Sequence, residues 1–223
     1  MIPERPLDLT VWYDYHCPYS YRVTAWLLGL GPDRVRPRFR PFPLEQVNRD
    51  PAATGWRLWE QPLDYVHYRD RQNRRPLQAF LATALLEDAE PPSVVDGFRL
   101  ATYRARFGEA ADISDLAVLV RLAGAAGADD DRLARALADE AALVDARADL
   151  ARAWSDARSA YEIFGVPTIE PAGQRPFYLR LERAVEPGRE AIDLLGQVMG
   201  MRRDAPIVLE LKLPDPVDPG PGA

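Results

Sequence analysis

The only cysteine of the chain, Cys17, stands where an apolar strand pattern ends and an amphipathic helical pattern begins. A thiol at a helix start lies beside unpaired backbone N–H groups and the positive end of the helix dipole, and both favour thiolate over thiol. Pro18 fits the first helical turn, where its missing N–H would have had no partner. The pattern predicts a reactive thiolate at Cys17, and the alternative is an ordinary, half-buried small residue.

Ser20 follows Cys17 at the spacing at which a two-cysteine redox site carries its second thiol. Because a chain with one cysteine cannot form an internal disulfide, any redox cycle needs an outside thiol. The Ser20 hydroxyl can hydrogen-bond a thiolate and lower the pKa of Cys17, but it cannot resolve a mixed disulfide. Two mechanisms stay open: Cys17 attacks and a small thiol releases it, or Cys17 and Ser20 only orient a bound thiol whose own sulfur reacts.

His16 is the titratable residue next to Cys17 in the sequence, and it has two candidate roles. As imidazolium it could stabilise a thiolate, or it could act as an acid or base on a bound substrate. Neighbouring side chains at a strand end alternate in direction, so we favour a local turn contact instead. No metal site is expected, since Cys17, His16 and His67 supply too few ligands for a closed zinc site.

Aromatic residues gather near the start of the central part of the chain. Trp56 and Trp59 could form one wall of a cleft and receive a flat aromatic substrate, with Tyr19 as a third candidate. Core packing is the more common fate of such residues. Substrate or thiol binding by these three is therefore the alternative hypothesis.

Composition excludes several classes of protein. The chain has 223 residues with a net charge of -6, and no basic run that would suit a nucleic acid. No apolar stretch is long enough to span a membrane, and the first residues lack the basic start and apolar centre of a signal peptide. We expect a cytoplasmic, reducing location, which suits a lone free thiol. The abundance of arginine, alanine and proline resembles the usage of a GC-rich bacterial genome.

Strand signals lie at both ends of the chain and helical periodicity lies between them. Residues 7–14 are apolar on both faces and predict a central strand. Residues 35–44 contain three prolines, which predicts an edge or short strand. Pro167 is tolerated best at a strand start, where it can adopt the cis form. The remaining predicted segments are a helix at 21–30, a helix-rich stretch from 45 to about 161, a strand near 165–169, a short strand at 177–181, a helix at 188–199, a strand at 207–211 and a disordered tail from 214.

This order resembles the DsbA-like branch of the thioredoxin fold, and it is most similar to FrnE-like oxidoreductases, kappa-class glutathione transferases and 2-hydroxychromene-2-carboxylate isomerases. Three anchors carry the resemblance: Asp14-Tyr15-His16-Cys17-Pro18-Tyr19-Ser20-Tyr21, Arg40-Pro41-Phe42-Pro43-Leu44 and Phe164-Gly165-Val166-Pro167-Thr168. It implies an α/β, thioredoxin-like fold with a large all-helical insertion. The implied division is a thioredoxin-like part at 1–45 and 161–203, a helical insertion at 46–160 and a C-terminal extension at 204–223.

The resemblance implies roles only where residues match. Cys17 falls on the nucleophilic cysteine, Pro167 on the cis-proline and Val166 on the residue whose backbone pairs with a bound peptide or thiol. The chain departs from both groups, because the oxidoreductases have cysteine where Ser20 stands and the isomerase group usually has serine where Cys17 stands.

The leading functional hypothesis is a thiol–disulfide oxidoreductase that acts through Cys17 with a low-molecular-weight thiol. The alternatives are a thiol-dependent isomerase or transferase and a non-catalytic binding module on the same fold. No tightly bound cofactor is expected, and glutathione or another small thiol or disulfide is the expected partner. Nucleic acid and membrane are not expected partners, and the family analogy implies a homodimer.

Overall fold

A computed structural model describes residues 5–49, 55–159 and 161–204. Its sheet has the strand order β2-β1-β3-β4, in which β1 runs parallel to β2 and antiparallel to β3. β1 therefore has a neighbour on each side, which confirms the predicted central strand. The strands are β1 (Leu7–Tyr13), β2 (Val35–Pro41), β3 (Thr168–Pro171) and β4 (Phe177–Tyr178).

The two faces of β1 pack differently because its side chains alternate. Leu9, Val11 and Tyr13 are buried in the main core, on the side of helix α1 (Pro18–Leu30). Helix α9 (Arg189–Asp204) packs beside α1, and the indole N–H of Trp26 donates to the Ala191 carbonyl at 3.0 Å. Trp12 is buried on the opposite face, in a separate cluster that contains Cys17.

The prolines of β2 mark it as the edge strand. Leu7 N–H donates to Arg34 O and Phe42 N–H donates to Tyr13 O. Together with the residue pairing of the two strands, these bonds show that the even-numbered residues of β2 direct their backbone N–H groups toward β1. The backbone nitrogens of the odd-numbered Pro37 and Pro41 therefore point away from β1, toward the open edge of the described sheet. Proline is tolerated there because no ladder hydrogen bond is lost, and the missing N–H groups hinder pairing with another strand.

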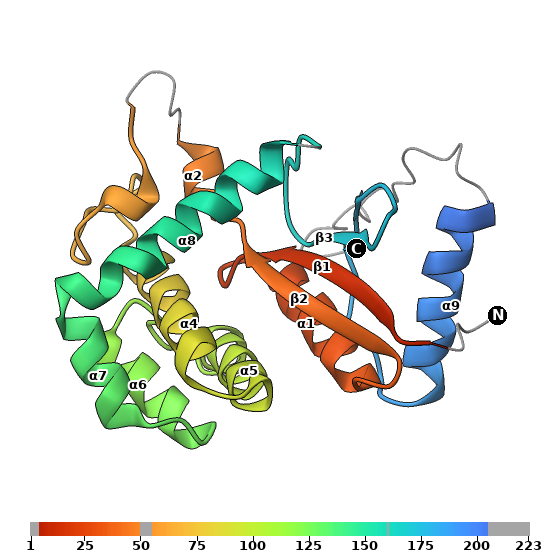
Figure 1. The fold of residues 1–223 in the computed structure, drawn as a ribbon, viewed down its shortest axis with the longest axis horizontal. Coiled ribbons are helices and arrows are strands. Elements are labelled where there is room, and N and C mark those ends of the chain that lie inside the picture. Colours follow the sequence, from red (N-terminus) through yellow and green to blue (C-terminus); the bar gives the residue numbers. More distant parts are fainter. Residues whose placement is uncertain (1–4, 50–54, 160, 205–223) are drawn as a thin grey trace, which may run out of the picture.

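The chain between β2 and β3 is mainly helical, and it forms the part of the molecule at the left in Figure 1. Within it, Leu77 and Leu81 are fully buried. Helix α8 is the longest and passes close to β2. The helices are α2 (Leu44–Asn48), α4 (Leu77–Ala89), α5 (Pro92–Gly108), α6 (Leu116–Ala125), α7 (Asp130–Ala138) and α8 (Glu140–Ser159), with short 3₁₀ turns at Leu58–Glu60 and Gln72–Arg74.

The observed helices and strands differ from the sequence-based expectations mainly at their ends. The short strand expected at 177–181 is only the two residues of β4, and α9 starts one residue later than expected and continues to Asp204. The predicted strand at 207–211 and the tail lie outside the described residues. Among the described helices, none is long and apolar enough to cross a membrane.

Candidate functional site

Cys17 is the N-cap residue of α1. The turn after β1 closes with a hydrogen bond from Cys17 N–H to Asp14 O at 3.1 Å. Ser20 N–H donates to the Cys17 sulfur at 3.4 Å, so the thiol takes the place that a hydroxyl or carboxylate oxygen usually takes at a helix N-cap. Pro18 occupies the first helical turn, as predicted.

The loop before β3 brings the second half of the site to Cys17. The Cys17 thiol donates to Val166 O at 3.4 Å, across a sequence separation of 149 residues. The Val166–Pro167 peptide bond is cis. Thr168 closes the loop by donating from its hydroxyl to Gly165 O at 2.7 Å. Cys17, Val166 and Pro167 therefore meet at one place, and Ser20 adjoins the sulfur.

The pKa of Cys17 is raised, so the expectation of a stabilised thiolate is wrong. Burial is the main cause, because the side chain is 4% exposed and the charged form loses its hydration. Hydrogen bonds from the Ser20 side chain and backbone lower the pKa, and the nearby Asp14 carboxylate raises it further. Desolvation outweighs the favourable helix start, so Cys17 is a protonated thiol at neutral pH.

Asp14 is a buried carboxyl group in the turn that carries Cys17. Its Oδ1 accepts from His16 N–H at 2.6 Å, and its Oδ2 accepts from Leu44 N–H at 2.7 Å. Burial raises the pKa of Asp14 to about 6, against the effect of these two hydrogen bonds and with a further rise from Glu45. Asp14 thus ties the Cys17 turn to the start of α2. Sequence reasoning overlooked it, although an acidic residue directly after an apolar strand was the available signal.

His16 points toward the helical insertion. Its Nδ1 accepts from Arg106 Nε–H, at 3.1 Å, in α5. Burial and, to a smaller extent, the positive charge of Arg106 together lower the pKa of His16 to about 3. The imidazole is therefore neutral at neutral pH, and the hypothesis of an imidazolium that stabilises a thiolate is wrong. The backbone N–H of His16 does make a local turn contact, with Asp14.

An apolar cluster surrounds the thiol. It contains Trp12, Phe42 and Val166, with Tyr19 and Trp154 packed against it. The rings of Phe42 and Trp154 stack with their centroids 5.2 Å apart. Sequence reasoning missed Trp154, because it lies in a strongly charged helix, α8, that showed no separate aromatic signal.

The two tryptophans expected at a substrate wall lie further from the thiol. Trp59 contacts Trp154, a residue packed against the cluster, with ring centroids 6.2 Å apart. Trp56 lies under the guanidinium of Arg49, which is 4.0 Å from the ring centroid. Both pack against the main core, in agreement with the more common fate of such residues. Substrate binding by either one stays a hypothesis.

Exposed aromatic side chains border the loop that carries Val166. Phe164 is 69% exposed, and its ring lies 5.4 Å from that of Tyr178 in β4. Arg180 lies over the Tyr19 ring at 4.0 Å and donates to the Tyr19 hydroxyl. Burial raises the pKa of Tyr178, and both Arg180 and Cys17 are near enough to influence it. We call Tyr19, Phe164, Tyr178 and Arg180 the aromatic rim of the site.

Within the described part of the chain, no three His, Cys, Asp or Glu residues are placed to hold an ion together. The site holds a buried thiol, Cys17, between the start of α1 and the Val166 carbonyl.

Comparison with known families decides the classification. The DSBA-like thioredoxin domain matches residues 8–178, which run from β1 to β4 and include Cys17 and Pro167. The chain belongs to the DSBA-like thioredoxin family. The thioredoxin-like α/β fold with a helical insertion, predicted from the sequence, is thereby confirmed. No curated protein is significantly similar to this DSBA-like chain in sequence.

Solved structures show the same fold at low sequence identity. A probable DsbA oxidoreductase from Streptomyces coelicolor is 20% identical with a TM-score of 0.54, and the match covers 96% of this chain and 97% of that one. The cytosolic disulfide reductase DsbM from Pseudomonas aeruginosa, solved with GSH, is 17% identical with a TM-score of 0.54 and coverages of 86% and 99%. A 2-hydroxychromene-2-carboxylate isomerase is 16% identical with a TM-score of 0.56 and coverages of 90% and 99%. DSBA-like chains of this shape thus include both oxidoreductases and an isomerase.

Proposed function

We propose that this DSBA-like protein is a thiol–disulfide reductase that works through Cys17 alone, with a low-molecular-weight thiol such as glutathione as the reductant. The observation that carries the proposal is the position of the Cys17 sulfur, which caps α1 and lies 3.4 Å from Val166 O, with Ser20 where a resolving cysteine would stand. The aromatic rim would contact the part of the substrate beyond its sulfur atoms. A reducing compartment such as the cytoplasm suits this chemistry.

The reaction needs three exchange steps. The Cys17 thiolate attacks one sulfur of a substrate disulfide, the S–S bond breaks, and the leaving thiolate takes a proton. The thiolate of an outside thiol then attacks one sulfur of the mixed disulfide, and the bond between Cys17 and the substrate half breaks. The outside thiol is now bonded either to the substrate half or to Cys17, and the other half is released as a thiol. A second molecule of the outside thiol completes the cycle. One substrate disulfide becomes two thiols, and two small thiols become one small disulfide.

The raised pKa of Cys17 favours reduction over oxidation as the direction of the reaction. Strongly oxidising members of the wider thioredoxin superfamily owe that property to a stabilised thiolate in the reduced form. Burial removes that stabilisation here. A thiol of raised pKa is also a poor leaving group, so the mixed disulfide at Cys17 should persist until another thiol attacks it.

The test compares three proteins after exposure to glutathione disulfide, with intact mass as the readout. Wild type should gain one glutathione, and Cys17→Ser should gain none. Ser20→Cys should lose the adduct and form an internal disulfide, because residue 20 adjoins the Cys17 sulfur. Two outcomes would contradict the proposal. One is the absence of an adduct on folded wild type, and the other is an equal rate of reduction of a mixed-disulfide substrate by wild type and Cys17→Ser in the presence of glutathione.

A thiol-dependent isomerase or transferase is the second candidate, and the protonation state of Cys17 favours it. A neutral thiol that already donates to a carbonyl could donate to the thiolate of a bound cofactor instead. Serine can make the same hydrogen bond. Cys17→Ser should therefore largely keep an isomerase or transferase activity and lose a reductase activity, which separates the two candidates.

A further inference from the structure

A cavity lies between β2 and the helical insertion. It has a volume of about 400 Å³, and its walls come from β2, α4, α5 and α8. Cys17 and the aromatic rim are not among its lining residues. Cavities at the junction of two structural units are common places for small ligands.

Arg99 of α5 forms part of the lining, and it is an unusual residue to find buried. Its side chain is 2% exposed, and its guanidinium lies 4.7 Å from the centroid of the Tyr13 ring and 4.5 Å from that of Phe39. Nη2 donates to Glu87 Oε1 at 2.9 Å. Nε and Nη1 are buried and make no hydrogen bond within the described chain, although Asp96 Oδ1 lies 3.9 Å from Nε as an ion pair. A buried cation with unused donors is destabilising unless an acceptor reaches it.

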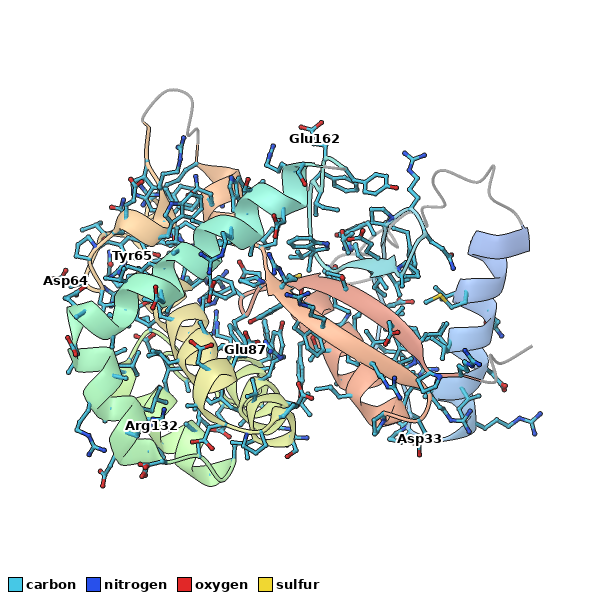
Figure 2. All side chains as sticks on the ribbon, in the orientation of Figure 1. Asp33, Asp64, Tyr65, Glu87, Arg132 and Glu162 are labelled. Carbon is cyan, nitrogen blue, oxygen red and sulfur yellow. The ribbon has the colours of Figure 1, made fainter. Side chains whose placement is uncertain are left out.

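Glu87 shows that a carboxylate can reach this guanidinium from the cavity. It lines the same cavity, belongs to α4, and its side chain is 46% exposed. Figure 2 labels Glu87 on the side of α4 that faces the strands. Glu87 is thus partly exposed to solvent while its carboxylate accepts a hydrogen bond from the buried Arg99.

The other charges around the cavity restrict the kind of ligand. Arginines and carboxylates are equal in number along the lining, so the cavity as a whole offers no excess of positive charge to a polyanion. Among the charged lining residues, Arg99 is the buried one, and it lies beside the aromatic side chains of Tyr13 and Phe39. The charged lining residues are Arg38, Arg40, Arg99, Arg152, Glu87, Glu90, Asp96 and Asp149.

We propose that this cavity binds a small, flat monocarboxylic acid, whose carboxylate accepts hydrogen bonds from Arg99 and whose apolar body lies against the aromatic wall. A singly charged acid suits a lining of balanced charge. Phosphate carries more than one negative charge and would be repelled more strongly by the carboxylates of the cavity lining. The site is separate from the thiol–disulfide chemistry of Cys17 and does not depend on it.

The test uses benzoate as the probe and benzamide as its neutral match, with binding to the full chain measured by calorimetry or ligand-observed NMR. Benzoate should bind wild type at least tenfold more tightly than benzamide does. Arg99→Met should weaken benzoate at least tenfold. Because that variant could fail to fold, Ala84→Phe provides a second one: it fills the cavity, keeps Arg99, and should also abolish binding.

Arg36→Ala is the matched control. Arg36 is an exposed arginine of the same strand, β2, and is absent from the cavity lining, so its loss should leave benzoate affinity unchanged. Several outcomes would overturn the site: no benzoate binding to folded wild type, equal binding of benzamide, unchanged binding in Ala84→Phe, or an equal loss in Arg36→Ala. Arg99 would then be only a clamp between α5 and α4.

Discussion

Replacing Asp14 by Asn should change how the stability of the protein depends on pH. The folded-state pKa of Asp14 is about 6, above the ordinary value of 3.8, because the carboxyl is buried. Folding therefore favours the protonated form. The stability that Asp14 contributes is fully present below pH 3.8 and is lost as pH rises through 6.

The size of the effect follows from the shift. A difference of about two pKa units corresponds to about 3 kcal/mol, at about 1.4 kcal/mol per unit. Asn cannot ionise, so the Asp14→Asn variant should gain about 3 kcal/mol relative to wild type between about pH 4 and pH 7. Asp14→Asn also has a pH-independent cost in unfolding free energy, because the Asn side chain can accept a hydrogen bond from only one of His16 N–H and Leu44 N–H.

The assay is urea unfolding of both proteins at several pH values, with the difference in unfolding free energy plotted against pH. Asp8→Asn is the control, because Asp8 is an exposed residue of the same strand. A flat difference for Asp14→Asn across this pH range would refute the reasoning. A second readout is the alkylation rate of Cys17 at neutral pH, which should rise in Asp14→Asn because the carboxylate no longer raises the pKa of the thiol.

Three further changes test other parts of the site. The difference in unfolding free energy between His16→Gln and wild type should shift in favour of the variant by about 3 kcal/mol as pH falls from 7 to about 4. In wild type, the folded state holds His16 neutral, with a pKa of about 3, whereas the unfolded chain takes up a proton in this range. Urea unfolding across pH measures this, and parallel curves would contradict it. Phe42→Ala should cost about 3–5 kcal/mol, because Phe42 is fully buried against Trp154, and a loss under about 1 kcal/mol would show that the cluster does not hold the site. Tyr103→Phe should cost about 1 kcal/mol by removing the hydrogen bond to Asp14 O, and no change in unfolding free energy would show that this bond contributes nothing.

Local signals in the sequence were enough to predict the positions of the strands and of the thiol. Pro37 and Pro41 excluded a central strand because proline removes a backbone donor, and the structure places both at the open edge of the sheet. The strand and helix-start signals depend on residue type and spacing, which the sequence states directly. The approach of the Val166–Pro167 segment to Cys17 was implied by the family resemblance, and the structure places the Cys17 sulfur 3.4 Å from Val166 O.

The chemistry of the thiol was decided only by tertiary structure. The helix start by itself favours thiolate at Cys17, but Trp12, Phe42 and Val166 come together from three separate segments and exclude the water that would stabilise the charge. The same reason explains His16, whose charge is suppressed by burial and by Arg106, 90 residues away. It also explains why Arg99 was not foreseen as a buried cation, since nothing near it in the sequence indicates the cavity that it lines. Burial and electrostatic environment arise from contacts between distant segments, so the sequence determined which groups are present and the fold determined their charge.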